Sequence, residues 1–356
     1  MRVAIRCDAS PRMGTGHVRR MAALGHALLT RGHTVRFVSR NLGVDIASML
    51  PSGAELTLLE KPDDKVEFTN DDAPHAAWAE VSWQRDALET AANLEGFRPD
   101  QVIVDHYAFD ARWHAAVRET TGAKIVAVDD MADRDLACDL LVDHNHAADH
   151  REKYAAHLPA SARVCGGPGY ALLAPAYADA PRHEPSDDVR SIGIFIGGTD
   201  ADDVAGAVLD ALGNIGFDGP VELVATSASV HLAALSARAA TDPRLTLSQD
   251  LPDLAAFLAR HDLQIGGGGG ATWERCCIGA PTLALAIADN QIPVLAPIAE
   301  LGAVSMLDIR KELRTLPHAI AALIEDAPRR ARLAATARAL VDGKGAARVV
   351  AAMEEL

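Results

Sequence analysis

Short apolar runs alternate with amphipathic stretches along most of the chain, and this alternation is typical of β-strands joined by helices. In the first half, the pattern predicts a strand over residues 3–7, a helix over 18–29, and further strands over 34–39, 101–105 and 124–129. A βαβα rhythm of this kind predicts a parallel, doubly wound α/β sheet.

The rhythm breaks in the middle of the chain. Residues 160–188 are rich in proline, glycine and charge, as linkers are. Beyond this segment the alternation returns, with predicted strands over 191–196, 221–225 and 263–265 and a helix over 204–212. The sequence therefore predicts two α/β halves of similar size.

We expect these halves to form two Rossmann-like domains, an N-terminal one over residues 1–165 and a C-terminal one over 189–356, joined by a linker over 166–188. Open α/β sheets bind ligands at the carboxyl ends of their strands. A cleft between the carboxyl ends of the two sheets is therefore the expected place for a ligand.

The composition is that of an ordinary globular protein. Of the 356 residues, 49% are hydrophobic and 23% are charged, which excludes collagen, coiled coil and a disordered chain. No apolar run approaches the ~18 residues of a spanning helix, and the N-terminus MRVAIRCD lacks the apolar region of a signal peptide. The net charge of −15 argues against binding of nucleic acid or of an anionic membrane.

The cysteines are five in number and have no CxxC spacing. An odd count without paired motifs indicates reduced thiols of a cytoplasmic protein rather than a disulfide framework or a zinc site. These cysteines are Cys7, Cys138, Cys165, Cys276 and Cys277.

Positive charge is concentrated at the N-terminus. Residues 1–40 carry eight arginines against one acid, Asp8, which gives +7 and leaves −22 for the rest of the chain. A positive segment in an acidic chain indicates a local anion site. The alternative is that some of these arginines only solvate helix faces.

The first candidate for chemistry is the segment RCDASPRMGTGH, residues 6–17, which follows the first predicted strand and opens the first helix. Gly14 and Gly16 allow a ligand to approach the backbone closely, and the helix start offers unpaired N–H groups to an anion. His17 lies at that start, where the helix dipole and nearby arginines disfavour imidazolium. A general base requires a neutral imidazole; the alternative is a histidine that only caps the helix.

The second candidate is IGGGGGATWE, residues 265–274, which follows a short predicted strand. Five glycines before a helix are costly in backbone entropy, so they imply close approach by a ligand. A phosphate at the helix start beside Thr272 fits this pattern. Glu274 either accepts hydrogen bonds from ribose hydroxyls or only complements the helix dipole.

Two shorter segments also follow predicted strands, VDHY over 104–107 and ADNQ over 288–291. Each is weak by itself, because a polar residue after a strand often starts the next helix. Acids and histidines crowd residues 129–150 and 200–203, but neither segment has a known ligand spacing. No metal site is therefore expected.

Taken in order, the segments RxDxS, GxGHxxR, VDHY, CGxxxYALL, GGTD, GGATWE and DNQ resemble the UDP-2,4-diacetamido-2,4,6-trideoxy-β-L-altropyranose hydrolases of pseudaminic acid biosynthesis. These enzymes are similar in fold to GT-B glycosyltransferases, especially the lipid-II-forming N-acetylglucosaminyltransferase. The resemblance runs from residue 1 to about residue 300 and implies a GT-B fold whose C-terminal domain binds UDP.

The resemblance also implies roles for single residues. His17 matches the catalytic base, Tyr107 and Asn290 match residues that place water or sugar, and Glu274 matches the glutamate that holds the uridine ribose. The further residues implied in substrate or UDP binding are Arg6, Asp8, Gly14, Gly16, Gly198, Thr199, Gly269, Gly270 and Thr272.

The implied reaction is attack of water at the anomeric carbon of the UDP-diacetamido-trideoxy sugar, with inversion and release of UDP. Helix starts and glycine runs can receive the diphosphate charge, so neither metal nor cofactor is expected. Two alternatives stay open. One is a GT-B glycosyltransferase that uses a UDP-N-acetylamino sugar, and the other is a non-catalytic nucleotide-sugar binding protein.

Overall fold

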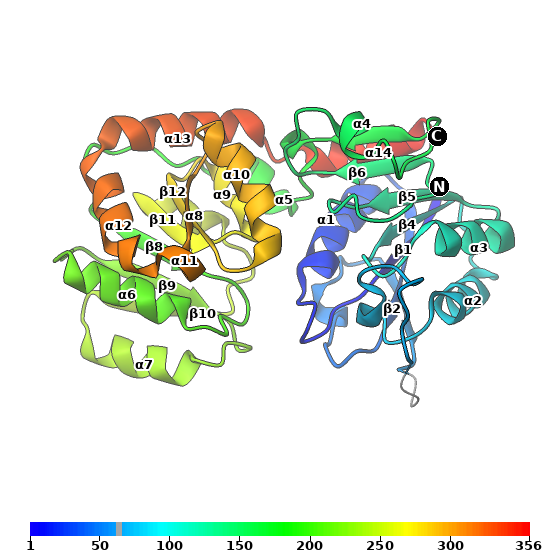
Figure 1. The fold of residues 1–356 in the computed structure, drawn as a ribbon, viewed down its shortest axis with the longest axis horizontal. Coiled ribbons are helices and arrows are strands. Elements are labelled where there is room, and N and C mark those ends of the chain that lie inside the picture. The colour runs from blue at the N-terminus through cyan, green and yellow to red at the C-terminus, as the bar shows by residue number, and fades with distance from the viewer. Residues whose placement is uncertain (62–65) are drawn as a thin grey trace. The chain divides into compact units, whose positions relative to one another are not determined.

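The computed structural model describes residues 1–61 and 66–356, and the chain divides into two compact units (Figure 1). Unit 1 consists of Met1–Pro175 together with Gly343–Leu356, and unit 2 is the continuous segment Ala176–Asp342. Each unit contains one parallel sheet and the helices that cover it. The predicted class, two doubly wound α/β domains, is confirmed.

Unit 1 has a seven-stranded sheet with the order β3-β2-β1-β4-β5-β6-β7. Its strands are β1 (Arg2–Cys7), β2 (Thr34–Arg40), β3 (Glu55–Leu59), β4 (Gln101–Asp105), β5 (Lys124–Val128), β6 (Leu140–Asp143) and β7 (Arg163–Gly166). Its helices are α1 (Gly16–Thr30), α2 (Trp83–Leu94), α3 (Ala111–Thr121), α4 (His150–Lys153) and α14 (Gly345–Glu354), with short 3₁₀ turns η1 (Ala47–Met49), η2 (Ala76–Trp78) and η3 (Pro168–Tyr170).

Unit 2 has a six-stranded sheet with the order β10-β9-β8-β11-β12-β13. Its strands are β8 (Ile192–Phe195), β9 (Val221–Ala225), β10 (Leu245–Gln249), β11 (Leu263–Gly267), β12 (Thr282–Ala286) and β13 (Ser305–Asp308). Its helices are α5 (Pro175–Asp179), α6 (Val204–Asn214), α7 (Leu232–Thr241), α8 (Ala255–Arg260), α9 (Ala271–Ile278), α10 (Ile292–Glu300), α11 (Ile309–Glu312), α12 (Leu316–Glu325) and α13 (Ala327–Leu340), with 3₁₀ turns η4 (Asp289–Gln291) and η5 (Leu313–Thr315).

Alternate residues of the central strands face opposite sides of each sheet. On β1, Val3 and Ile5 are buried with α1 and α14, whereas Ala4 is buried with α2 and α3. Central strands buried on both faces are typical of parallel sheets that helices cover on both sides. Each unit therefore has a core of its own on its sheet.

In both sheets the chain builds one edge first and then returns to the other side of its first strand. In unit 1 this return pairs β4 with β1, and in unit 2 it pairs β11 with β8. At such a switch point the connections leave neighbouring strands in opposite directions, which opens a place for a ligand at their carboxyl ends. Most of the candidate residues follow β1 and β4 in unit 1, or β8 and β11 in unit 2.

The last helix, α14, belongs to unit 1, although the sequence predicted a second domain over 189–356. Val349 and Met353 of α14 are fully buried with residues of α1. The side chain of Gln101 on β4 donates a hydrogen bond to the Met353 carbonyl at 2.8 Å. Gly345 allows α14 to begin against residues 170 and 171, because a Cβ at that position would collide with their backbone.

The chain therefore passes between the units twice. The first passage follows Pro175, inside the predicted linker of residues 166–188, and the second follows Asp342, where no linker was predicted.

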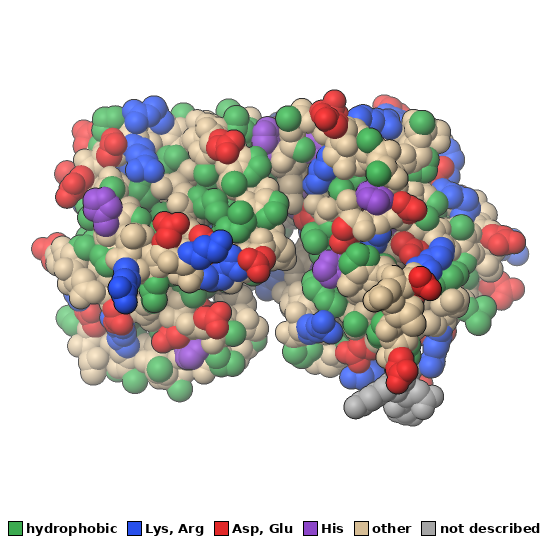
Figure 2. Space-filling model, in the orientation of Figure 1, with side chains coloured by type: hydrophobic (Ala, Val, Ile, Leu, Met, Phe, Trp, Pro, Cys, Tyr) green, Lys and Arg blue, Asp and Glu red, His purple; other side chains and the backbone are tan. Residues whose placement is uncertain are grey.

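All five cysteines are free and buried. Among the residues that the structure describes, no helix has both the length and the apolar character required to cross a membrane. Figure 2 shows acidic and basic side chains interspersed over the visible surfaces of both units.

Candidate active site

A histidine–carboxylate pair lies at the switch point of unit 1. The parallel pairing of β1 with β4 sets Cys7 beside Asp105, so the ends of both strands meet. Asp105 ends β4, and His17 is the second residue of α1, to which the loop after β1 leads. Nδ1 of His17 lies 2.6 Å from Oδ1 of the fully buried Asp105.

Arg20, about one turn further along α1, binds the same carboxylate. Its Nε and Nη2 donate to the two oxygens of Asp105 at 2.6 Å each, and Nη2 lies 3.2 Å from Nδ1 of His17. Burial alone would raise the pKa of Asp105, but the charges of Arg20 and His17 hold that pKa well below its usual range. Asp105 is therefore an anion at neutral pH.

An anionic carboxylate at Nδ1 holds a proton on that nitrogen of a neutral imidazole, and the lone pair then lies on Nε2. No hydrogen bond to Nε2 of His17 is formed by any of the residues that the structure describes. The expected base thus has a carboxylate that orients it, which the sequence did not reveal. Its acceptor nitrogen is open for a reacting proton.

Aromatic side chains surround the imidazole of His17. The ring of Tyr107 stands edge-on to it with centroids 4.8 Å apart, and Trp78 of η2 is also edge-on at 6.5 Å. Trp78 in turn lies 5.2 Å from His75 and 5.7 Å from Tyr107. Trp78 and His75 are partly exposed, and the sequence analysis did not predict them. With Tyr107, which it did predict, they give the site an apolar wall of the kind that the C–H face of a sugar ring can contact.

The hydroxyl of Tyr107 forms a hydrogen bond with a second carboxylate. It donates to Oδ1 of Asp130 at 2.6 Å, and Asn145 donates to Oδ2 of the same side chain at 3.1 Å. Burial and the negative charge of Asp130 raise the pKa of Tyr107 well above its usual value. Tyr107 therefore stays protonated and can position groups, but it is a poor base.

His144 is a second buried histidine, and its charge would interact with that of Asp130. Burial and the charge of Arg20 lower its pKa to about 4, so it is neutral at physiological pH. Asp130 and His144 lie in the acid- and histidine-rich stretch of residues 129–150, which sequence analysis examined only for metal ligands.

Arg6 and Asp8 were predicted to bind substrate, but the structure places both in the interior. Both side chains are fully buried, and Arg6 bonds to both carboxylate oxygens of Asp8 and also to Asp86 at 2.6 and 3.0 Å. Asp8 also accepts a hydrogen bond from the backbone of Arg40 at 2.7 Å. A group with no exposed surface cannot touch a ligand, so these residues support the ends of β1 and β2 instead.

Ion pairs of this kind also neutralise positive charge in residues 1–40, the charge from which the sequence analysis predicted a local anion site. Acids from later parts of the chain, in addition to Asp8, meet five of the eight arginines. The pairs are Arg6 with Asp8 and Asp86, Arg20 with Asp105, Arg31 with Glu354, Arg36 with Glu55, and Arg40 with Asp86 and Glu89.

Helix α1 nevertheless has an open start. Its N-cap, Thr15, makes no side-chain hydrogen bond to the helix, and the first turn contains no acid. Gly14 has a positive φ of 77°, a conformation that glycine adopts without strain. Gly16 has a negative φ, and no atom lies within 4 Å of where its Cβ would be. Packing within unit 1 therefore does not require a glycine at 16.

In unit 2, the glycine run separates into two parts. At Gly267, a Cβ would collide with the carbonyl oxygen of Ile196, and at Gly268 it would lie 2.5 Å from Leu295. At Gly269 and Gly270, no atom lies within 4 Å of the Cβ position, and neither residue has a positive φ. The first part of the run is explained by close packing in the sheet, and the second part is not.

The open glycines lead directly into α9. Gly270 is its N-cap, and no side chain caps the helix. Thr272 is buried, and Glu274 in the first turn is partly exposed. Glu274 interacts with the buried Tyr177, whose pKa is raised by burial and by the charge of Glu274. The N–H groups of Thr272 and Trp273 donate to the carbonyls of Gly269 and Gly270 at 2.9 and 3.1 Å. Among the described residues, the N–H groups of Gly269, Gly270 and Ala271 have no such acceptor, and one carboxylate lies beside them.

The GGTD loop after β8 is arranged differently. Gly198 and Thr199 are exposed, but carboxylates already accept hydrogen bonds from the N–H groups at the start of the following helix, α6. Asp200 accepts from Val204 and Ala205 at 2.9 and 3.0 Å, and Asp203 accepts from Gly206. An anion would therefore meet carboxylates at α6, whereas it would meet open N–H groups at α9.

Asn290 lies in η4 of unit 2 and is exposed. It therefore belongs to a different unit from His17 and Tyr107, which the structure brings together. Its part in placing water or sugar stays a prediction. Among the residues described, no group of three or more His, Cys, Asp or Glu side chains is arranged to hold a metal ion.

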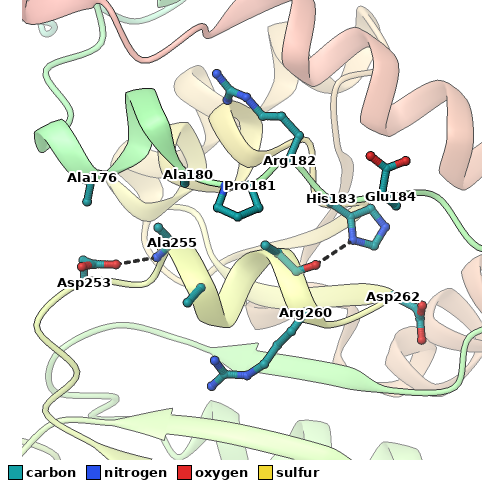
Figure 3. Close-up of a pocket in the computed structure, with 12 residues that line it drawn as sticks. Ala176, Ala180, Pro181, Arg182, His183, Glu184, Asp253, Ala255, Arg260 and Asp262 are labelled. Atoms are coloured by element: carbon teal, nitrogen blue, oxygen red, sulfur yellow. Dashed lines mark hydrogen bonds between the residues drawn. The ribbon is translucent and has the colours of Figure 1, made fainter.

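A cavity of about 590 Å³ lies elsewhere in unit 2, between residues 180–184 and α8 (Figure 3). His183 and Asp253 line it, and their hydrogen bonds go to backbone atoms of α8. None of the residues predicted to bind substrate lines this cavity, so it contributes nothing to the candidate site.

No protein-family model matches this chain. Spore coat polysaccharide biosynthesis protein SpsG of Bacillus subtilis (strain 168) is 27% identical over 262 residues, which are 72% of this chain and 77% of that protein. MurG of Acinetobacter baumannii matches with a TM-score of 0.69 and 15% identity, over 100% of this chain and 99% of that one. MnaA of S. aureus, in a co-structure with UDP, matches with a TM-score of 0.69 and 14% identity, over 99% and 96% of the two chains.

These structural likenesses cover whole chains at low identity, and what they show is the fold. The two α/β units of this protein have the GT-B architecture that the resemblance implied.

Proposed function

We propose that this protein is a nucleotide-sugar hydrolase that releases UDP from a UDP-2,4-diacetamido-2,4,6-trideoxy sugar by attack of water at the anomeric carbon. The observation that carries the proposal is the His17–Asp105 pair, in which a buried carboxylate orients an imidazole whose Nε2 is open. A water molecule is the simplest nucleophile for such a base. The printed name of the SpsG relative, a polysaccharide biosynthesis protein, supports a role in glycan biosynthesis.

In the proposed reaction, Nε2 of His17 accepts a proton from water as the oxygen of that water bonds to the anomeric carbon. The bond from this carbon to the β-phosphate oxygen breaks at the same time, and UDP leaves with the electron pair. Direct displacement inverts the configuration at the anomeric carbon. Asp105 stabilises the imidazolium that forms, and Arg20 holds Asp105 in place.

The nucleotide is proposed to bind in unit 2, with its diphosphate at Gly269, Gly270 and the start of α9. The glycines that packing leaves unexplained support this placement, and the likeness to MnaA, a protein with a UDP co-structure, supports UDP as the ligand. Glu274 is proposed to accept hydrogen bonds from the ribose hydroxyls. Because UDP is a good leaving group and the helix start can receive its charge, the reaction needs neither metal nor cofactor.

The resemblance supplies the rest of the proposal. We place the enzyme in the cytoplasm, in the biosynthesis of pseudaminic acid for a surface glycan, with the β-L-altropyranose isomer of the UDP-sugar as substrate. Tyr107 and Asn290 are proposed to position the water or the sugar.

The test is turnover of a panel of UDP-diacetamido sugars in ¹⁸O-water with EDTA and without any acceptor, followed by mass spectrometry. We expect release of UDP and one ¹⁸O atom in the free sugar. Label in UDP instead would show cleavage of the P–O bond and contradict attack at carbon. Binding without turnover of any sugar in the panel would favour the non-catalytic alternative.

A glycosyltransferase is the second candidate, because the GT-B fold carries such enzymes and His17 would serve equally to deprotonate an acceptor hydroxyl. A lipid-linked acceptor calls for an apolar surface beside basic groups. In the described part of unit 1, the exposed large apolar side chains are Leu58 on β3 and Leu88 on α2, and β3 is separated from β4 by two strands. Turnover that appears only when an acceptor alcohol is added would favour the transferase.

A further inference from the structure

Arg275 of α9 is a buried cation without an ion-pair partner. It is 1% exposed, and among the residues described no carboxylate lies within ion-pair distance of its guanidinium. Its Nε and Nη1 have no hydrogen-bond partner. Burial lowers its pKa to about 10, so it still carries its charge at neutral pH.

Other buried arginines of the chain have more partners, although Nε of Arg40 also lacks a hydrogen bond. Arg6 and Arg40 meet buried carboxylates, and Arg330 donates to four backbone carbonyls. Burying an unpaired charge is one of the more costly features that a fold can contain. Arg275 therefore differs from Arg6 and Arg40 in having no carboxylate partner, and from Arg330 in leaving two guanidinium nitrogens without a hydrogen bond.

The guanidinium of Arg275 lies under the glycine loop. Nη2 donates to the Gly267 carbonyl at 2.6 Å and to the Thr272 hydroxyl at 3.1 Å. Nη1 lies against Gly266, where a Cβ would collide with it. The side chain thus runs back along α9 towards the N-terminus of the helix, as long helical side chains do.

This position brings two positive features together. The start of α9 carries the positive end of the helix dipole and has no capping side chain. A cation beneath it is unfavourable unless an anion binds above. The bond to Gly267 also holds one loop carbonyl towards the interior, so that this oxygen does not compete with an anion for the loop N–H groups.

We propose that Arg275 is the electrostatic support of a diphosphate site at the start of α9, where it attracts the phosphate charge and positions Gly267 and Thr272. This inference rests on the proposed function for the identity of the nucleotide. Arg275 is a positioning residue here, because it acts through the loop and through its charge.

The test compares Arg275→Met and Arg275→Lys with the wild-type chain in binding inorganic pyrophosphate, UDP and uridine, by calorimetry and by competition NMR for weak ligands. We expect Arg275→Met to weaken pyrophosphate and UDP binding by about 10-fold to 100-fold and to leave uridine binding unchanged. Arg275→Lys should restore most of the affinity. Arg330→Met, which removes another buried arginine of unit 2, should not alter the ratio of UDP to uridine affinity.

If Arg275 only stabilised the fold, the variants would behave differently. Equal losses for UDP and uridine, or no loss for UDP, would overturn the proposal. The melting temperature of ligand-free Arg275→Met should be unchanged or higher, because the unpaired buried charge is gone. If that variant does not fold, Arg275→Gln serves for the same comparison.

The two proposals fail separately. Arg275-dependent binding of pyrophosphate without binding of UDP would leave this anion site standing and remove the nucleotide assignment. Binding of neither ligand by the wild-type chain would overturn both.

Discussion

The carboxyl ends of the two sheets differ in which polar groups they leave available to a ligand. In unit 1, side chains of opposite charge form ion pairs, such as Arg6 with Asp8 and Arg20 with Asp105. Nε2 of His17 has no hydrogen-bond partner among the described residues. In unit 2, the end of β11 presents backbone and two glycines, with one buried cation beneath them. This difference fits the proposed function, in which the edge of unit 1 transfers a proton and the edge of unit 2 holds an anion by its backbone.

The largest expected effect is that of His17→Asn on turnover. General-base catalysis contributes about 10²-fold to 10⁴-fold, so kcat should fall by that factor. Affinity for UDP should be unchanged, because the nucleotide is assigned to the other edge. Steady-state kinetics and calorimetry on the same preparation measure both quantities.

If His17→Asn keeps more than about a tenth of wild-type turnover, another group is the base, and the division of tasks between the two edges is wrong.

A smaller loss of turnover is expected for Asp105→Asn. The amide cannot hold the Nδ1 proton as an anion does, and it leaves Arg20 with only the more distant carboxylate of Asp130 at 3.9 Å. Because the imidazole itself is kept, kcat should fall by up to about 10²-fold, the lower bound for losing a general base. Stability should fall as well, because a buried ion pair is broken. Glu55→Gln, at the exposed Arg36 pair, is the matched control and should alter neither quantity by much. Full activity in folded Asp105→Asn would show that the carboxylate does not orient the base.

Glycine-to-alanine changes sharpen the comparison within unit 2. Gly270 has a φ of −54° and no neighbour within 4 Å of a Cβ, so Gly270→Ala should leave stability unchanged or raise it by about 0.4–1 kcal/mol. Affinity for UDP should nevertheless fall, because the methyl group would occupy the proposed phosphate position. Gly267→Ala is the contrasting variant and should unfold more readily, since its Cβ meets the Ile196 carbonyl. Unaltered UDP affinity in Gly270→Ala would contradict the placement of the diphosphate.

The last expected effect does not involve turnover or ligand affinity: it is a pH dependence of the stability of unit 1. Burial and the charge of Arg134 lower the pKa of His114 to about 3, whereas in an unfolded chain it is about 6.5. Between these values the unfolded state binds a proton that the folded state does not. The free energy of unfolding should therefore fall as the pH falls, by about 1.4 kcal/mol per pH unit for such a group.

Denaturant titrations between pH 4 and 7 measure this slope, and His114→Gln should reduce it. His26→Gln, on the outer part of α1, is the control and should leave the slope as it is. A wild-type slope in His114→Gln would contradict the assignment.

The sequence predicted the central strands of both sheets, because apolar runs indicate burial. It predicted no strand at β3, β6, β7, β10 or β13. It did not predict the place of α14, since the stripe of Ala346, Val349, Val350 and Met353 would suit either sheet equally. Which face a helix covers depends on contacts that are distant in sequence.

The site was predicted only in part, because contacts between residues distant in sequence also build it. His17 could be found from its place at a helix start, but its partner Asp105 is 88 residues away, and only the pairing of β4 with β1 brings the two together. The glycine run could be singled out, but its division at Gly268 could not, because the packing against Ile196 and Leu295 is a property of the folded sheet. The count of arginines over residues 1–40 misled because most of their partners come from later in the chain.

The return of α14 to unit 1 has a consequence for the order in which the protein is synthesised. Unit 2 is continuous, so all of it has been translated by residue 342, whereas unit 1 has its first 175 residues but lacks α14 at that moment. Until residues 343–356 emerge, the face of α1 that meets Val349 and Met353 is without its cover. On the ribosome, the half that begins first is therefore expected to finish folding last.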